Sequence, residues 1–388
     1  MKTGLRFLGA LLMASTVVLA KERADNRQVL DPVVVRGQRP PLIKLNVNYR
    51  LLTARFGAAA VTDGDYIYVI GGGNSQGVPL DDIERFNLRT GVSEPFAKLK
   101  IARRHHRAVL YLGKIYVLGG YSGTGFAETE IFENSMEVVD LATGKVTQAP
   151  RMLIAKANFG CAISGGKIYV IGGAKVRGNN LASTNSVEVF DLARNTWEKG
   201  LAMPIPRMNT AVNVEDFIIV PGGTSNRQAL GNVEVLNPRD QVWRELPPLH
   251  KHVSANSLVF LDHYLFLFAE HELVAYELRE KKSESFAFEY TAAGDTAAII
   301  NDGKIFVIGG REYAGPALED TFSQPSEHVT GRGPSTGEAA MKNPFVLKAG
   351  DPLRDGDGMP DFGAMKEIQV FELRSVIAPA SAKKSSTN

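Results

Sequence analysis

The 388-residue chain lacks several features that would mark common classes of protein. It has one cysteine, Cys161, which excludes an intramolecular disulfide framework and any zinc or iron–sulfur site built from several thiolates. It also lacks an excess of either charge, because 44 Lys and Arg residues stand against 42 Asp and Glu residues, for a formal net charge of +2. Dedicated nucleic-acid binders carry a strong basic excess, so we expect no nucleic-acid partner.

Catalytic signatures and long apolar runs are also missing. The HExxH, P-loop and GxGxxG patterns do not occur. No segment after the N-terminus approaches 18 consecutive apolar residues, so we expect no membrane span. The 44% of apolar residues is nevertheless typical of a globular protein.

The N-terminal twenty residues predict export. Lys2 and Arg6 precede an apolar run over 7–20, and Val18 and Ala20 are the small residues that a signal peptidase needs at positions −3 and −1. We therefore predict a signal peptide over 1–20, cleaved after Ala20, and a periplasmic or secreted mature protein. An uncleaved N-terminal anchor is the alternative, which we favour less. Residues 21–41 are predicted to be a linker.

A unit of about fifty residues recurs through the rest of the chain. Its mark is an aliphatic strand that ends in paired glycines, seen in DYIYVIGGG (65–73), KIYVLGG (114–120), KIYVIGG (167–173), FIIVPGG (217–223) and KIFVIGG (304–310). The first glycines are spaced 48, 53, 50 and 87 residues apart, and the last interval fits two units. In its middle, YLFLFAE (264–270) aligns with the others but has Ala269 and Glu270 in place of the glycines. The chain therefore has six units, of which the fifth is degenerate.

A second element confirms this count. After each glycine pair comes an alternating strand: IERFNL (83–88), MEVVDL (136–141), VEVFDL (187–192), VEVLN (233–237), LVAYEL (273–278) and IQVFEL (368–373). Turn signals divide each unit into about four short strands, and no amphipathic helix is evident. One such unit cannot bury both of its faces, whereas radial stacking of the units closes a core and protects the strand edges.

The glycine pairs, the later strand and the downstream Trp197 and Trp243 resemble kelch repeats, over roughly residues 51–373. This resemblance implies an all-β, six-bladed kelch-type β-propeller with four-stranded blades, which we place at 42–373. Closure of such a ring needs one more strand. We expect LIKLNVNY (42–49) to supply the outer strand of the sixth blade, with Ser375–Ala378 as the alternative. Residues 374–388 are predicted to be a disordered tail.

The sixth unit contains a long insertion, which we place at 311–366. Within it, Asp355, Asp357 and Asp361 resemble the alternating carboxylates of bacterial calcium loops. The first ligand position of that pattern falls on Leu353, so we favour a plain acidic turn over a Ca²⁺ site. No cofactor is expected to be required.

Aligning the units on their glycines predicts a binding site at the central funnel. In the aligned units, a single position just before the first strand holds, from the first unit to the sixth, Gly57, His105, Asn158, Met208, Ala255 and Asp295. Asn209 occupies the neighbouring position of the fourth unit. In kelch proteins that bind peptides, residues at similar positions of the repeat face the central funnel. The candidate ligand-binding residues are His105, Tyr121, Asn158, Asn209, His271, Asp295 and Arg311. The alternative is that strand entrances are polar only because they are exposed.

Two functional classes follow. We favour an exported, monomeric binding module for an envelope or extracellular protein or a glycan. The alternative is a carbohydrate isomerase that resembles the exported kelch sialic-acid mutarotases. In that case Asp295 and His105 would act as acid and base, and Arg311 would hold the substrate carboxylate. His250 and His252 could bind a metal together, although polar loop residues are the commoner explanation.

Overall fold

The computed structural model describes residues 42–123, 131–177, 180–226, 228–254, 257–269, 272–287, 294–312 and 363–373. Throughout these ranges the secondary structure is β-strand and turn. No helix in the described part of the chain is long and apolar enough to cross a membrane. The signal peptide, the linker, the tail and the acidic turn at 351–361 lie outside the described residues.

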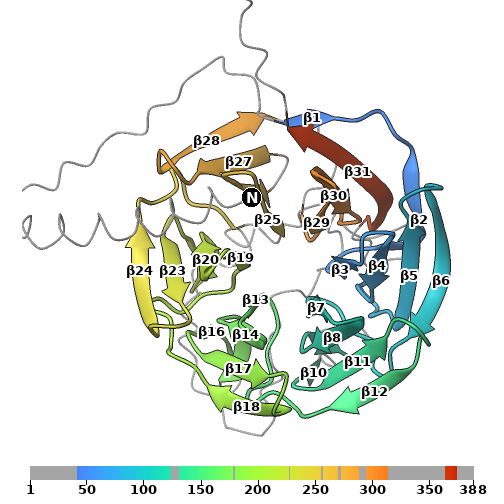
Figure 1. Ribbon diagram of the computed structural model, residues 1–388, viewed down its shortest axis with the longest axis horizontal. Coiled ribbons are helices and arrows are strands. Elements are labelled where there is room, and N and C mark those ends of the chain that lie inside the picture. The colour runs from blue at the N-terminus through green and yellow to red at the C-terminus, as the bar shows by residue number, and fades with distance from the viewer. Residues whose placement is uncertain are drawn as a thin grey trace, which may run out of the picture. The chain divides into compact units, whose positions relative to one another are not determined.

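Six antiparallel sheets stand around a central axis as blades 1 to 6, which confirms the predicted six-bladed propeller (Figure 1). In blades 1 to 5 the strands run outward from the axis in chain order, and in blade 6 the N-terminal β1 lies outside β31. In blades 1 to 3 they are β3 (Ala59–Thr62), β4 (Tyr66–Ile70), β5 (Asp82–Asn87) and β6 (Val92–Lys98); β7 (Arg107–Tyr111), β8 (Lys114–Leu118), β11 (Met136–Asp140) and β12 (Val146–Ala149); and β13 (Gly160–Ser164), β14 (Lys167–Ile171), β17 (Val187–Asp191) and β18 (Thr196–Lys199). In blades 4 to 6 they are β19 (Val212–Val214), β20 (Phe217–Pro221), β23 (Val233–Asn237) and β24 (Val242–Leu246); β25 (Ser257–Leu261), β26 (Tyr264–Ala269), β27 (Glu272–Glu277) and β28 (Lys282–Ala287); and β29 (Ala297–Asn301), β30 (Lys304–Ile308), β31 (Met365–Leu373) and β1 (Leu42–Lys44).

The second and third strands of each blade form its apolar centre. They are short runs of β-branched and aromatic residues, such as KIYVI in β14 and VEVFD in β17, which suit strands buried on both faces. Five apolar clusters each join two neighbouring blades. Phe159 and Phe190 of blade 3, for example, pack with Leu118 and Met136 of blade 2. The core therefore lies between the blades, and no blade is stable by itself.

The N-terminal strand closes the ring, as the alternation over 42–49 predicted. β1 pairs with the end of β31, Leu42 opposite Leu373, and β2 (Tyr49–Arg55) begins beside the start of β31, Tyr49 opposite Ile368. The sixth blade thus combines strands from both ends of the described chain (Figure 1). The alternative closure, by Ser375–Ala378, lies outside the described residues.

Blades 1 to 4 each contain a buried ion pair that the sequence analysis did not predict. A cation just before the innermost strand meets a glutamate on the third strand of the same blade; we call this pair the clasp. The four clasps are Arg55–Glu84, Arg103–Glu137 (2.7 Å), Lys156–Glu188 (2.8 Å) and Arg207–Glu234 (2.7 Å). Both side chains of each clasp are at most 4% exposed.

The clasp of blade 2 also binds nearby backbone groups. Glu137 accepts hydrogen bonds from the amides of Lys100 (2.7 Å) and Ile101 (3.2 Å), and Arg103 donates to the carbonyl of Gly119 (2.9 Å), the first glycine of its blade. Because these bonds use most of the hydrogen-bonding capacity of both ions, the buried pair is compensated.

Candidate functional site

The residues that open the innermost strands form a ring of backbone contacts around the axis. Gly57, His105, Asn158 and Asp295 all have a positive φ, between 52° and 58°. Their main chains are joined from blade to blade: Gly57 N donates to Asp295 O (2.7 Å), His105 N to Gly57 O (2.7 Å), and Asn158 N to His105 O (3.1 Å). The internal alignment therefore placed these four residues in one structural position, as predicted.

Met208 does not occupy that position, and the prediction for blade 4 was wrong. Met208 pairs with Thr224 as Arg104 pairs with Tyr121 in blade 2, one place earlier. The segment from the clasp cation to the first glycine of the pair is one residue shorter in blade 4 than in blade 2. Arg207 precedes that glycine by 15 residues, whereas Arg103 precedes its own by 16. Asn209 therefore follows Met208 directly and donates its amide to Asn158 O (3.0 Å).

Gly57 lets residues of three blades meet at the axis. The imidazole of His105 in blade 2 lies over Gly57 of blade 1, where an added Cβ would come within 3.0 Å of the ring. This places His105 Nδ1 3.8 Å from Asp295 Oδ1 of blade 6. Arg311, which follows the glycine pair of blade 6, lies 2.8 Å from Asp295 Oδ2 through its Nε.

Aromatic side chains and two more arginines complete this group, which we call the axial cluster: Arg104, His105, Arg107, Tyr121, Asp295 and Arg311. The Arg104 guanidinium lies 5.7 Å from the ring centres of both Phe56 and Tyr121. Tyr121 meets His105 edge to face at 5.7 Å. Three arginines thus gather around a single carboxylate, which makes the cluster locally cationic.

Burial and this charge decide the protonation states. Burial, together with Arg104 and Arg311, lowers the pKa of His105 to about 4 although Asp295 opposes the shift, so its imidazole is neutral at neutral pH. Burial by itself would raise the pKa of Asp295, but Arg311 and His105 outweigh it and hold the pKa of that carboxyl below its usual value. At neutral pH the cluster therefore has three positive charges and one negative charge.

The other predicted binding residues are not members of the axial cluster, although Asn158 N donates to its His105 O (3.1 Å). Asn158 is half-buried at the same axial position in blade 3. Asn209 is buried, and its amide group packs where Cβ atoms on Gly160 and Gly172 would be. His271 and the predicted calcium residues Asp355, Asp357 and Asp361 lie outside the described residues.

His250, a possible metal ligand, and Cys161, a thiol, both make contacts that indicate a structural role. His250 contacts two serine hydroxyls, Ser283 Oγ at 3.0 Å and Ser285 Oγ at 2.8 Å, which supports the polar-loop interpretation. Within the described ranges, no group of three His, Cys, Asp or Glu residues is placed to hold a metal. Cys161 packs against the core between blades 2 and 3, and burial raises the pKa of its thiol to about 12, so the thiol stays protonated.

Replacing Gly57 with alanine should separate His105 from Asp295. The new Cβ would meet the imidazole at 3.0 Å, and a φ of +58° would cost about 1–2 kcal/mol with any side chain. Because Asp295 is the neighbour that raises the pKa of His105, we expect this pKa, followed by NMR, to fall below its wild-type value of about 4. Gly113→Ala is the control, because Gly113 has a φ of +71° but no atom near its Cβ position. An unchanged His105 titration in Gly57→Ala would contradict this geometry.

The calcium hypothesis has a direct thermodynamic test. Since we favour a plain acidic turn at 351–361, we expect the same melting temperature in excess Ca²⁺ and in EDTA. A ligand that binds only the native state must raise the melting temperature. A rise in Ca²⁺ that disappears in the Asp355→Asn/Asp357→Asn variant would instead establish the site.

Comparison with known proteins gives the same repeat. The kelch motif model matches residues 54–100, 102–153 and 155–204, which are the first three blades. Human Kelch-like protein 34 is 31% identical over 148 residues, which are 35% of this chain and 22% of that protein. Kelch domain-containing protein 8B of Rattus norvegicus is 32% identical over 172 residues, 42% of this chain and 48% of that protein. Beta-scruin of Limulus polyphemus is 30% identical over 161 residues, 38% of this chain and 17% of that protein.

These alignments span less than half the length of each relative. The three motif matches coincide with the strands of blades 1, 2 and 3. The chain therefore folds as a six-bladed β-propeller whose first three blades match the kelch motif.

Proposed function

We propose that this kelch propeller is an exported binding module whose axial cluster takes an acidic segment of a partner protein. The observation that carries the proposal is the charge of the cluster, with Arg104, Arg107 and Arg311 around the single carboxylate of Asp295. Arginine binds carboxylates through two parallel hydrogen bonds, and partial burial strengthens such contacts. Export rests on the N-terminal sequence, with the envelope or the extracellular space as the place of action.

Apolar side chains near the cluster favour a protein over a small anion. The hairpins β9 (Tyr121–Ser122) with β10 (Ile131–Phe132), and β15 (Ala174–Arg177) with β16 (Asn180–Ser183), extend from the same ends of blades 2 and 3. They expose Ile131, Val176 and Leu181. Exposed apolar groups beside a charged centre are typical of protein-interaction surfaces.

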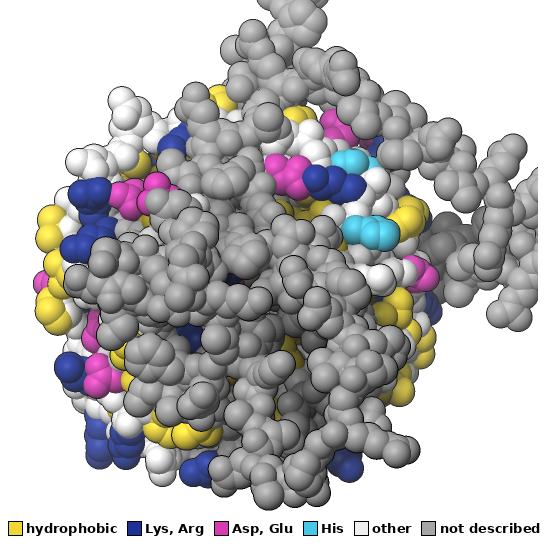
Figure 2. Space-filling view, turned by 180° about the vertical axis from the view of Figure 1, so that it is seen from behind, with side chains coloured by type: hydrophobic (Ala, Val, Ile, Leu, Met, Phe, Trp, Pro, Cys, Tyr) yellow, Lys and Arg dark blue, Asp and Glu magenta, His cyan; other side chains and the backbone are white. Residues whose placement is uncertain are grey.

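The charge elsewhere on the ring gives no comparable preference. Figure 2 shows basic and acidic side chains interspersed around the rim of one face rather than gathered by sign. Several rim charges are paired, such as Lys167 with Glu198 and Arg239 with Asp216. We therefore assign the preference for an anion to the axial cluster.

A pair of peptides tests this proposal. We expect a fluorescent Glu-rich peptide to bind the full chain and a Lys-rich peptide of equal length not to bind, by fluorescence anisotropy. Arg311→Ala should weaken binding about tenfold, since it removes a charge-assisted contact. Arg194→Ala is the matched control, because Arg194 is exposed on the turn between β17 and β18, at the other end of the strands. Equal affinities of the two peptides, or of the wild type and Arg311→Ala, would refute the proposal.

The same geometry supports a second candidate, a periplasmic isomerase of acidic sugars. A neutral His105 beside the ionised Asp295 can take up a proton, and Arg311 lies where it could hold a substrate carboxylate. In that case the protein should accelerate the mutarotation of a sialic acid followed by NMR, and His105→Asn should abolish the acceleration. Peptide binding without such acceleration decides for the binding module.

A further inference from the structure

A cavity of about 540 Å³ lies where blades 6 and 1 meet, at the opposite end of the strands from the axial cluster. The axial cluster forms where innermost strands begin, whereas this cavity lies among the turns β3–β4, β5–β6 and β29–β30, where innermost strands end. Its volume is in the range of small-molecule sites. The two sites share no residue.

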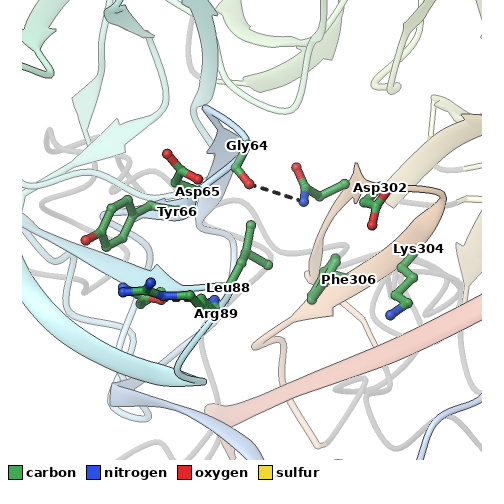
Figure 3. Close-up of a pocket in the computed structure, with 10 residues that line it drawn as sticks. Gly64, Asp65, Tyr66, Leu88, Arg89, Asp302, Lys304 and Phe306 are labelled. Atoms are coloured by element: carbon green, nitrogen blue, oxygen red, sulfur yellow. Dashed lines mark hydrogen bonds between the residues drawn. The ribbon is translucent and has the colours of Figure 1, made fainter.

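The turns of two blades meet at this cavity. The β3–β4 turn of blade 1 and the β29–β30 turn of blade 6 each have two residues at their tip, since Asp63 N donates to Tyr66 O (3.2 Å) and Asn301 pairs with Lys304. Gly64 lies at the tip of the blade 1 turn, and its carbonyl accepts a hydrogen bond of 3.4 Å from Asn301 Nδ2 of blade 6. The dashed line at Gly64 in Figure 3 marks this hydrogen bond between the two blades.

The centre of the cavity is apolar. Leu88 of blade 1 and Phe306 of blade 6 lie across it from one another (Figure 3). Phe306 is buried and belongs to the core between these blades, so this wall is rigid. At the same position blades 1, 2 and 3 have Tyr68, Tyr116 and Tyr169, and the Tyr68 hydroxyl donates to Asp63. The phenylalanine of blade 6 leaves this space without a polar group, which suits an apolar or aromatic part of a ligand.

Charges of both signs flank this apolar centre. Asp65 and Arg89 lie on the blade 1 side, and Asp302 and Lys304 lie on the blade 6 side (Figure 3). None of these four forms an ion pair within the part of the chain that the structure describes. All four side chains are exposed, so they remain available to a ligand that has both a positive and a negative group.

We infer that this cavity, which we call the seam pocket, binds a small zwitterion with an aromatic group, such as a free aromatic amino acid. The ring lies between Leu88 and Phe306, the carboxylate meets Arg89 and Lys304, and the ammonium group meets Asp65 and Asp302. The balance of two cations and two carboxylates selects a ligand with both charges over one that has only one of them.

The test uses phenylalanine and two analogues with the same ring, titrated into the full chain by NMR or calorimetry. 3-Phenylpropanoate lacks the ammonium group and 2-phenylethylamine lacks the carboxylate. We expect phenylalanine to bind about tenfold more tightly than either analogue, because each analogue leaves one charged pair unmade. Arg89→Ala/Lys304→Ala should weaken phenylalanine binding at least as much.

The matched control is Arg279→Ala/Lys114→Ala, which removes the residues at the same repeat positions in blades 5 and 2, away from the pocket. It should leave phenylalanine binding unchanged, and denaturation curves of both double variants should show that they are folded. The inference is overturned if phenylalanine does not bind, if either analogue binds equally well, or if both double variants bind like the wild type. Since the peptide experiment reports only on the axial cluster, either proposal can fail without the other.

Discussion

Replacing Glu137 with valine should destabilise the propeller by about 3–5 kcal/mol, because it leaves the buried guanidinium of Arg103 without its counter-ion. Both side chains of this clasp are fully buried, and Arg103 also donates to Ser135 Oγ (3.0 Å) and Gly119 O (2.9 Å). Arg103→Val should cost a similar amount, since it strands the carboxylate instead. Denaturation with urea measures each free energy of unfolding.

The double variant Arg103→Val/Glu137→Val is the critical comparison. Blade 5 has Val253 and Val274 at the two clasp positions, so an apolar pair occurs there within this same protein. We therefore expect the double variant to lose less than the sum of the single losses, by at least about 2 kcal/mol. Additive losses would show that the ions act independently and that the clasp is not a coupled pair.

Lowering the pH from 7 to 4 should destabilise the protein strongly, because two neighbouring histidines are buried in neutral form. Burial and Arg104 lower the pKa of His105 to about 4, and burial with Arg103 and Arg107 lowers the pKa of His106 well below its usual value. In the unfolded chain both titrate near 6.5, so below that pH the unfolded state binds more protons than the folded state. The stabilisation is complete above pH 6.5 and is lost as the pH falls toward the folded pKa values. His105 alone should account for about 3 kcal/mol by pH 4.

Variants taken from blade 3 isolate this effect. Asn158 and Phe159 occupy the positions of His105 and His106, and Asn158 has the same φ of 52° as His105. The variant His105→Asn/His106→Phe should therefore fold and should show a much flatter dependence of unfolding free energy on pH between 7 and 4. His252→Gln changes an exposed histidine and should keep the wild-type profile. An equally steep profile in the double variant would assign the acid sensitivity to other groups.

The clasp shows what a more complete sequence comparison could have found. Its cations precede the first glycine by 16 residues in blades 1 to 3 and by 15 in blade 4, and each glutamate is the second residue of a VEV-like strand. In blade 5 both charged residues are replaced by valines, Val253 and Val274. A cation and an anion that recur and vanish as a pair predict a buried ion pair. The same one-residue difference also shows that Met208 was aligned to the wrong position.

The sequence by itself determined the blade count, the degenerate fifth blade and the strand that closes the ring. These features follow from local rules, since paired glycines mark turns with a positive φ and alternating strands mark sheets. Only the tertiary structure decided which side chains meet between blades. His105 reaches Asp295, 190 residues away along the chain, because Gly57 of the blade between them lacks a Cβ. The seam pocket lies where the β3–β4 turn of blade 1 meets the β29–β30 turn of blade 6, and where blade 6 has Phe306 in place of a tyrosine. The repeat encodes how each blade folds, whereas contacts between blades depend on the size and charge of residues that only ring closure brings together.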